Sequence, residues 1–218
     1  MTETLLNSND EIPHAAEPFK SGYVAVVGRP NVGKSTLTNR LLGQKIAAVS
    51  PRPQTTQRNQ LSIITTDSAQ LILIDTPGIH RAKNKLGEIM NDAAKGTFTD
   101  ADWILWIVDA SERISADDAA IAETFRKLNL SGSVIVALNK IDLLRGKSRE
   151  NPGADFRSAL PGASFIEISA QTGMGCAELL KTLIERLPEG PRFFDPDQIT
   201  DLRSEEHTSE LQSPIVIS

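Results

Sequence analysis

The sequence predicts an α/β fold in which helices cover both faces of a six-stranded, mostly parallel sheet. The first observation is a set of apolar runs with the length of buried strands, at residues 23–27, 71–74, 103–108, 134–138 and 165–168. The second is that helix-like segments alternate with these runs, around residues 35–42, 86–98, 116–128 and 175–187. Such alternation favours parallel strands joined by right-handed crossovers. The chain has 218 residues, of which 39% are hydrophobic, so it can bury one sizeable core.

The first apolar run leads into a glycine-rich loop of the form G-x-x-x-x-G-K-S, and a helix-like segment follows at once. This strand–loop–helix order separates a phosphate-binding loop from a chance turn. The glycines let main-chain N–H groups face phosphate oxygens, and the helix adds the positive end of its dipole. We expect Lys34 to reach the β- and γ-phosphates and Ser35 to ligate Mg²⁺. The predicted phosphate-binding residues are Gly28, Arg29, Pro30, Asn31, Val32, Gly33, Lys34, Ser35 and Thr36.

The segment from Ser50 to Arg58 is polar and rich in proline, so we predict a loop there. A loop at this place in the chain can be ordered by a γ-phosphate and its Mg²⁺ and released on hydrolysis. We favour Thr56 over Thr55 as the threonine that touches both, and the alternative is a surface threonine. The sixth strand, from Gln60 to Thr65, is predicted at the edge of the sheet.

The apolar run 71–74 ends in Asp75, Thr76, Pro77 and Gly78. We expect the Asp75 carboxylate to hold Mg²⁺ through water and the Gly78 N–H to approach the γ-phosphate. The next residue, Ile79, has no polar group to orient an attacking water, so intrinsic hydrolysis should be slow. The side-chain carbonyl of Asn31 is a candidate K⁺ ligand that would bring positive charge to the phosphates. The alternative is that Asn31 only stabilises a turn.

The run 134–138 is followed by Asn139-Lys140-Ile141-Asp142, the N-K-x-D spacing of a guanine reader. The Asp142 carboxylate can accept hydrogen bonds from guanine N1–H and from its exocyclic amine, and adenine offers neither donor there. The stem of Lys140 can pack over the base, and Asn139 can tie this loop to the phosphate loop. Farther on, the N–H groups of Ser169 and Ala170 are expected to meet guanine O6. The four motifs in this order predict a GTPase of the translation-factor type.

These motifs assign named roles to a small set of residues. The residues assigned to catalysis are Lys34, Asn31, Thr56 and Gly78, and those assigned to the metal are Ser35, Thr56 and Asp75. The net charge of −5 argues against broad electrostatic binding to RNA by this chain. The basic stretch 80–85 is a local exception, although a solvated loop is the favoured interpretation there.

Three further residues carry structural expectations. Cys176 is the single cysteine, so no internal disulfide can form, and we expect it to be a small buried residue at the start of the last helix. Trp103 and Trp106 are three residues apart in a strand-like run. They should therefore point to opposite faces of the sheet and pack against helices.

The stretches GRPNVGKSTLTNRLLGQKIAAVS, PRPQTTQ, LIDTPGIH and NKIDLL together closely resemble the bacterial Era GTPases of the TrmE–Era group. The resemblance covers roughly Ser21 to Asp201. It includes LPEGPRFFDPDQITD, which is similar to the Era linker that leads to an RNA-binding KH domain. One departure is Gln57-Arg58, where the family usually has an arginine directly after the threonine pair, and this bears on the assignment of Thr56.

The resemblance implies a Ras-like P-loop NTPase domain that binds GTP or GDP with Mg²⁺. It implies a slowly hydrolysing switch in small ribosomal subunit assembly and rRNA processing, which contacts the subunit mainly through the KH domain. It also implies a cytoplasmic monomer with peripheral association with the inner membrane. Two rival interpretations are another TrmE–Era GTPase, acting in tRNA modification or carrying tandem GTPase domains, and an interaction module that binds nucleotide without hydrolysing it.

The expected domain organisation has four parts. Residues 1–20 are predicted to be a disordered extension, 21–188 the GTP-binding domain, and 189–202 the linker toward a KH domain. Residues 203–218 resemble an in-frame translation of a sequencing-adapter oligonucleotide, and we expect them to be a non-native tail that replaces the KH domain.

Overall fold

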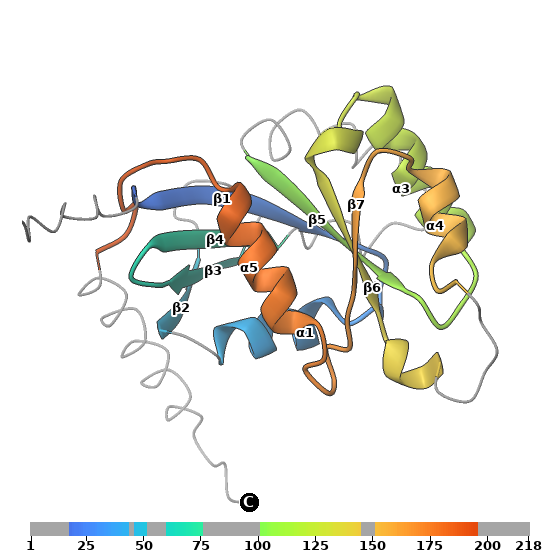
Figure 1. Cartoon of the computed structure of the whole chain (residues 1–218), viewed down its shortest axis with the longest axis horizontal. Coiled ribbons are helices and arrows are strands. Elements are labelled where there is room, and N and C mark those ends of the chain that lie inside the picture. The colour runs from blue at the N-terminus through green and yellow to red at the C-terminus, as the bar shows by residue number, and fades with distance from the viewer. Residues whose placement is uncertain (1–17, 44–45, 52–59, 76–100, 145–150, 196–218) are drawn as a thin grey trace, which may run out of the picture.

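The protein is built on a seven-stranded sheet with the strand order β2-β3-β4-β1-β5-β6-β7 (Figure 1). A computed structural model describes residues 18–43, 46–51, 60–75, 101–144 and 151–195. Five strands run parallel: β4 (Ala69–Asp75), β1 (Lys20–Val27), β5 (Trp103–Asp109), β6 (Val134–Asn139) and β7 (Ser164–Glu167). β3 (Gln60–Thr65) is antiparallel to β4, and β2 (Ile46–Pro51) is antiparallel to β3. The predicted α/β class with a mostly parallel sheet is confirmed.

The sheet has one strand more than the six predicted, because β2 forms its outer edge. The predicted strand 60–65 therefore lies one position inside the edge, and Ser50 and Pro51 belong to β2 rather than to a loop. Alanine is depleted in strands and two of the six residues are alanine, so local propensity is weak here. The hydrogen bonds of the antiparallel pairing with β3 stabilise the strand conformation that the local sequence favours only weakly. Pro51 is tolerated because it ends an edge strand.

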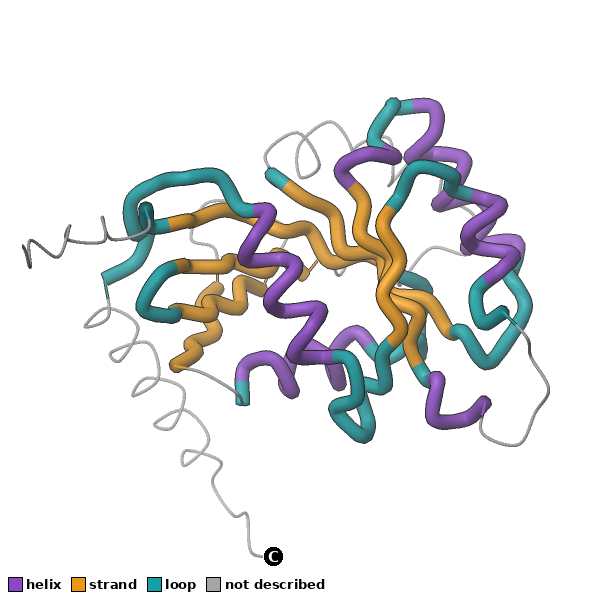
Figure 2. The backbone as a smooth tube through the Cα atoms, viewed as in Figure 1, coloured by secondary structure: helices purple, strands orange, loops and turns teal. Residues whose placement is uncertain are grey.

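Helices cover both faces of the sheet, as Figure 2 shows. On one face, α1 (Lys34–Leu42) and α5 (Cys176–Arg186) bury leucines against β1, β4 and β5. On the other face, α3 (Ala116–Lys127) and α4 (Ala154–Ala159) pack against β5 and β6. Short 3-10 turns occupy Ser131–Ser133 and Ile141–Leu144. The six-residue α4 was not predicted, because so short a helix has no readable periodicity. The predicted helix 86–98 lies outside the described residues.

The two tryptophans of β5 divide between these faces, as predicted. Trp106 is fully buried in the α3/α4 layer, where its ring meets the edges of Phe125 and Phe156 at centroid distances of 5.7 and 5.8 Å. Trp103 packs against the α1/α5 layer and donates from Nε1 to the Arg186 carbonyl over 2.8 Å. Cys176 is also fully buried, as expected, and burial raises the pKa of its thiol.

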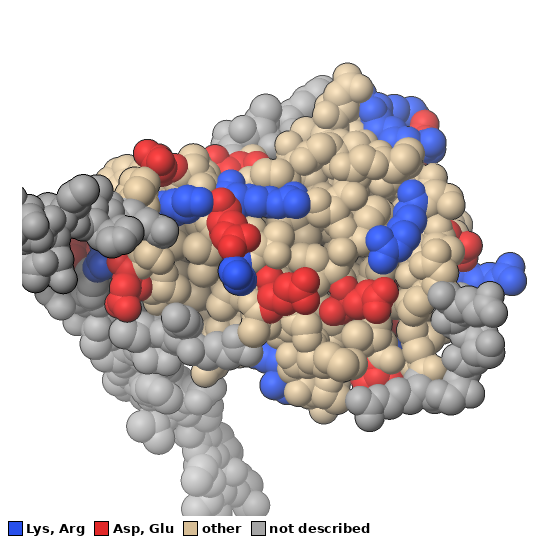
Figure 3. Space-filling model, in the orientation of Figure 1, with Lys and Arg blue, Asp and Glu red and all other residues tan. Residues whose placement is uncertain are grey.

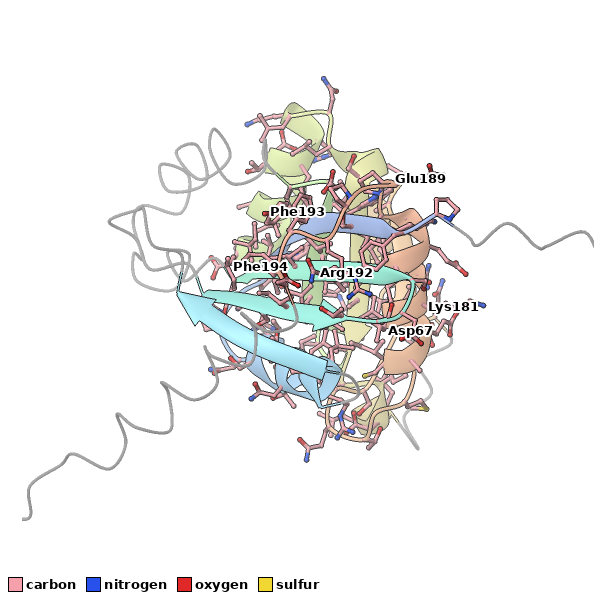
Figure 4. The ribbon with its side chains drawn as sticks, turned by 90° about the vertical axis from the view of Figure 1, so that its left-hand side faces the viewer. Asp67, Lys181, Glu189, Arg192, Phe193 and Phe194 are labelled. Carbon is pink, nitrogen blue, oxygen red and sulfur yellow. The ribbon has the colours of Figure 1, made fainter. Side chains whose placement is uncertain are left out.

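After α5, the segment Pro188–Asp195 returns along the sheet, and we call it the strap (Figure 4). Its start pairs with β1 through a bridge between Glu189 and Lys20. Farther on, the N–H groups of Phe193 and Phe194 both donate to Oε1 of the fully buried Gln70, over 2.8 and 3.0 Å. Gln70 Nε2 returns a hydrogen bond of 2.9 Å to the Phe194 carbonyl. The first part of the predicted linker is therefore fixed to the sheet.

Charged side chains of both signs are interspersed on the face shown in Figure 3, and no large area of that face has a single sign. This distribution agrees with the modest net charge of −5. In the described ranges no helix is both long and apolar enough to cross a membrane.

Candidate nucleotide-binding site

The glycine-rich loop connects the end of β1 to the start of α1, and its backbone is folded as a phosphate loop requires. Gly28 and Gly33 have φ values of +153° and +101°, which side chains rarely adopt. A Cβ at Gly28 would lie 2.4 Å from the Ile107 carbonyl oxygen, and one at Gly33 would lie 2.4 Å from Asn139 Nδ2. Both positions therefore need glycine. Asn31 has a φ of +64°, which asparagine tolerates better than most residues, so its turn-forming role is real.

Lys34 is buried at the first turn of α1 and folds its side chain back over the loop. Its Nζ donates to the carbonyls of Gly28 and Arg29, over 2.6 and 2.9 Å. Burial lowers the pKa of Lys34 to about 8, although the nearby Asp75 carboxylate opposes this shift. A buried cation whose hydrogen-bond partners among the described residues are carbonyl oxygens is well placed to receive an anion.

A pocket of about 510 Å³ opens beside this lysine. Its lining residues are Pro30, Asn31, Gly33, Lys34, Ser35 and Thr36. Asp75, at the end of the neighbouring strand β4, has a buried Oδ1 with no hydrogen-bond partner among the described residues. Hydroxyl and carboxylate oxygens are the ligands that Mg²⁺ prefers, so Ser35 and Asp75 fit the predicted metal position.

Two residues of the predicted phosphate loop support it from behind. The Arg29 guanidinium pairs with Glu112 and, over 3.2 Å, with the fully buried Asp118 of α3. Val32 is fully buried. Neither lines the pocket, so their predicted contact with phosphate is limited to the main chain.

A second pocket, of about 300 Å³, adjoins the first and shares Gly33 and Thr36 with it. It is lined in addition by Asn139, Lys140, Asp142, Leu143, Ala170 and Gln171. Asp142 has a buried Oδ1 without a partner among the described residues. A buried carboxylate oxygen left in this state needs a donor from a ligand or from water. The predicted base-reading residues are therefore brought together beside the phosphate loop.

Asn139 connects the two pockets, as predicted. Its Nδ2 donates to the Val32 carbonyl over 2.7 Å, and its Oδ1 accepts the Ala170 N–H over 2.8 Å. Its side chain is 2% exposed, so neither hydrogen bond is readily replaced by bulk water.

Lys140 is held by the end of β5. It has a φ of +66° and its Nζ contacts Asp109 Oδ2 at 2.6 Å. Burial alone would raise the pKa of Asp109, but hydrogen bonds from Lys140 and Ser111 outweigh it, so the pKa lies below the usual value. Asp109 is therefore charged at neutral pH and fixes the lysine stem beside the base pocket. Nothing in the sequence motif pointed to Asp109.

The loop after β7 differs from the prediction, because both N–H groups that were expected to meet guanine O6 have acceptors within the protein. The Ser169 N–H donates to the Met174 carbonyl over 2.9 Å and its side chain is fully buried. Ser169 thus stabilises the turn through hydrogen bonds within the loop. It does not line the pocket, because its side chain is buried inside this turn. The Ala170 N–H is engaged by Asn139. Gln171, which was not predicted, lines the base pocket. The Ser169-Ala170 motif thus locates the loop correctly but does not show which of its peptide groups faces the base pocket.

Several predicted residues lie outside the described residues. These are Thr56 and its neighbour Thr55, the run Thr76, Pro77 and Gly78, and Ile79 with the basic stretch 80–85. Residues 1–17 and 196–218, which hold most of the predicted extension and the whole predicted tail, also lie outside.

Residues 23–140, from the first strand through the phosphate loop to the first half of the base motif, match the family model described as 50S ribosome-binding GTPase. The chain belongs to this GTPase family. Within the family, its similarity is to Era, as the motifs predicted. The GTPase Era of Caldicellulosiruptor saccharolyticus is 44% identical over 194 residues, which are 88% of this chain and 64% of that protein. The GTPase Era of Clostridium perfringens is 40% identical over 193 residues, with the same two coverages of 88% and 64%.

A solved structure of an Era GTPase gives the same result. The crystal structure of Era in complex with MgGDPNP and nucleotides 1506–1542 of 16S ribosomal RNA has a TM-score of 0.66 at 40% identity. The match covers 83% of this chain and 61% of that one. The chain thus spans less than two thirds of the length of these GTPase relatives.

Proposed function

We propose that this chain binds GTP and GDP with Mg²⁺ and hydrolyses GTP slowly as a molecular switch. The observation that carries the proposal is the double hydrogen bond of Asn139. A single buried amide joins a phosphate loop to a loop beside a carboxylate oxygen, Asp142 Oδ1, that has no partner among the described residues. The site is therefore built for a ligand that has phosphates at one end and hydrogen-bond donors at the other.

At the phosphate end, main-chain N–H groups within 28–36 and the Lys34 ammonium bind the β- and γ-phosphates, although Pro30 has no N–H to donate. Ser35, Thr56 and Asp75 hold Mg²⁺, with Asp75 acting through water. The bound metal neutralises charge on the phosphate oxygens. Thr76, Pro77 and Gly78 follow Asp75 directly, and the Gly78 N–H meets the γ-phosphate.

At the base end, Asp142 accepts hydrogen bonds from guanine N1–H and from its amine. Lys140 packs its stem over the ring, Asn139 orients the loop, and the loop that begins with Ser169 and Ala170 supplies a main-chain donor to O6. An adenine would leave the Asp142 carboxylate unpaired, which costs affinity.

Hydrolysis needs positioning and charge rather than a covalent intermediate. Ile79 cannot orient water, so we assign the charge to K⁺ held by the exposed Asn31 side chain. Lys34, Asn31, Thr56 and Gly78 then form the catalytic set. Potassium-stimulated release of phosphate from GTP tests this step against the rival function. A protein that binds GTP but releases no phosphate in K⁺, even with ribosomal subunits, would be an interaction module.

We further propose that the chain acts in assembly of the small ribosomal subunit and processing of its rRNA. The support is the similarity to Era, one member of which is seen with MgGDPNP and a 16S rRNA fragment. A KH domain would make the main RNA contact, and this chain would be monomeric and cytoplasmic with peripheral membrane association. A role in tRNA modification is less well supported, because the linker sequence FFDPDQITD is of the Era type.

The deciding experiment is co-sedimentation of the chain with small ribosomal subunits, loaded with GDP or with GDPNP. Nucleotide binding is confirmed first. Pelleting only with GDPNP would show that the GTPase domain itself contacts the subunit. Absence from the pellet in both states would contradict a ribosome contact by this part of the protein.

A further inference from the structure

Arg40, in the last turn of α1, ties this helix to the loop that follows β7. Its Nε donates to the Ala170 carbonyl over 2.5 Å, and its Nη2 donates to the Gln171 carbonyl over 2.6 Å. Gly173, with a φ of +92°, brings the loop so close that a Cβ there would lie 2.9 Å from Arg40 Nη1. Since a guanidinium is a planar fork with fixed donor directions, two such hydrogen bonds fix the orientation of both carbonyls.

The orientation of the Ala170 carbonyl also determines that of a donor. In a planar trans peptide the C=O and the following N–H point in opposite directions. The Ala170 carbonyl and the Gln171 N–H belong to one peptide, so the Gln171 N–H points away from Arg40. It has no hydrogen-bond acceptor among the described residues, and Gln171 lines the base pocket together with Asp142.

The neighbouring donors of this loop are already engaged inside the protein. The Ser169 N–H donates to Met174, the Ala170 N–H to Asn139 Oδ1, and the Thr172 N–H to Ser169 Oγ. Among the main-chain N–H groups of the loop 169–172, the Gln171 N–H is therefore the one that the described structure leaves available to a ligand.

We propose that Arg40 is a positioning residue for base recognition, which holds the Gln171 peptide so that its N–H meets the carbonyl oxygen at position 6 of guanine. This inference rests on the proposed function, because it requires guanine in the base pocket. Without the guanidinium, the carbonyls of Ala170 and Gln171 hydrogen-bond to water instead. The peptide group formed by the Ala170 C=O and the Gln171 N–H is then no longer held in one orientation. The donor is then lost while Asp142 is untouched.

A simpler role for Arg40 is that of a cation that complements the C-terminal end of the helix dipole. The matched control for this role is Arg126, which also lies in the last turn of its helix, α3. Arg126 is exposed, and its ion pair is with Glu123 of the same helix. Arg126→Ala therefore removes a similar helix-end charge without touching either pocket.

The test compares the affinities of GDP and of 6-thioguanosine diphosphate, which keeps N1–H and the amine but carries sulfur, a weak hydrogen-bond acceptor, in place of the oxygen at position 6. Both are measured by calorimetry for the unmodified chain, Arg40→Ala, Arg40→Lys and Arg126→Ala. In the unmodified chain and in Arg126→Ala, GDP should bind more tightly than the analogue. In Arg40→Ala the GDP affinity should fall about tenfold, as expected for one oriented hydrogen bond, while the analogue affinity stays the same. Arg40→Lys keeps the charge but not the fork, so its preference for GDP should also collapse.

An equal loss of affinity for both nucleotides, or an unchanged preference in folded Arg40→Lys, would overturn the role of Arg40. Thermal unfolding of each variant verifies that it is folded at the temperature of the measurement. Failure of the unmodified chain to bind either diphosphate would instead contradict the proposed function itself. The two failures are thus distinguishable.

Discussion

The side-chain amide of Asn139 lies 2.7 Å from the Val32 carbonyl, 107 residues away in the chain. The same side chain accepts the Ala170 N–H from the loop after β7. Three segments that are separate in sequence are therefore held by one buried group. Its position at the end of a fully buried strand keeps it from rotating to other partners.

Replacing this group should weaken both ends of the site. In Asn139→Ala the Val32 carbonyl and the Ala170 N–H lose their partner, and two buried hydrogen bonds are worth about 1–3 kcal/mol together. We expect the Kd for GDP to rise about 10- to 100-fold, as measured by calorimetry. Asn151→Ala, at an exposed position, is the control and should bind normally. Normal GDP affinity in Asn139→Ala would contradict the bridging role.

Base selectivity should depend on Asp142. Asp142→Asn exchanges an acceptor for a donor, and xanthine offers a carbonyl where guanine has its amine. The variant should bind xanthosine diphosphate more tightly than GDP, with a reversal of about a hundredfold or more relative to the unmodified chain. Competition between the two nucleotides measures it. Asp155→Asn, in the exposed first turn of α4, should leave the preference unchanged. An unchanged preference in Asp142→Asn would show that the base lies elsewhere.

Nucleotide affinity should fall at alkaline pH because Lys34 has a pKa of about 8 in the free protein. Bound phosphates favour the charged form, so the pKa is higher in the complex. Affinity is therefore full below about pH 8 and decreases as the pH rises, by up to about tenfold per pH unit. Calorimetry in buffers of different ionisation enthalpy should also detect proton uptake above pH 8.

The control for this titration is Lys34→Arg, because arginine stays charged throughout the range. Its affinity, whatever the absolute value, should not follow the same pH slope. If the slope persisted in Lys34→Arg, another group, such as the base itself, would be the one that titrates.

Trp106 should be a major determinant of stability. It is fully buried between Phe125 and Phe156, so Trp106→Ala leaves a cavity and should lower the free energy of unfolding by about 3–5 kcal/mol. Urea unfolding measures the loss. Leu128→Ala, at a residue that is 43% exposed, should change it by less than about 0.5 kcal/mol. A small loss for Trp106→Ala would mean that the α3/α4 layer can close around the gap.

The strap should be released by Gln70→Ala. The substitution removes the acceptor of two N–H groups and the donor to the Phe194 carbonyl. We expect faster hydrogen exchange at the amides of residues 193 and 194, with slow exchange kept at the β1 amides. Thr66→Ala, a substitution on the turn just before β4, is the comparison and should leave the exchange of the strap unchanged. Unaltered protection in Gln70→Ala would show that the ring contact between Tyr23 and Phe193 is enough to hold the strap.

Most of the sheet and both ends of the site could be predicted because their determinants are local. Consecutive apolar residues predict a buried strand. The phosphate and base motifs are recognised because they need fixed residue types at fixed spacing. β2 was not predicted, because its small residues have little strand preference of their own and form a strand only by pairing with β3.

The supporting contacts could not be predicted, because they join positions far apart in the chain. Arg40 and Ala170 are 130 residues apart, and Gln70 and Phe193 are 123 apart. A polar residue in a helix or strand gives no sign of a partner at such a distance. Ser169 shows the opposite limit, since the motif located it correctly but could not tell that the turn would bury it.

Strand β4 places Gln70 and Asp75 on a single rigid rod, five peptide steps or about 17 Å apart. Asp75, at one end, lies close enough to Lys34 to influence its pKa, and Gln70, at the other end, holds the backbone of the strap by hydrogen bonds. The residues that follow Asp195 therefore begin at a fixed position relative to the sheet, because the strap before them is held in place. The reach of this following segment and its effective concentration at any target are set only by residues after the strap. The GTPase domain thus controls the direction in which its neighbour in the sequence begins.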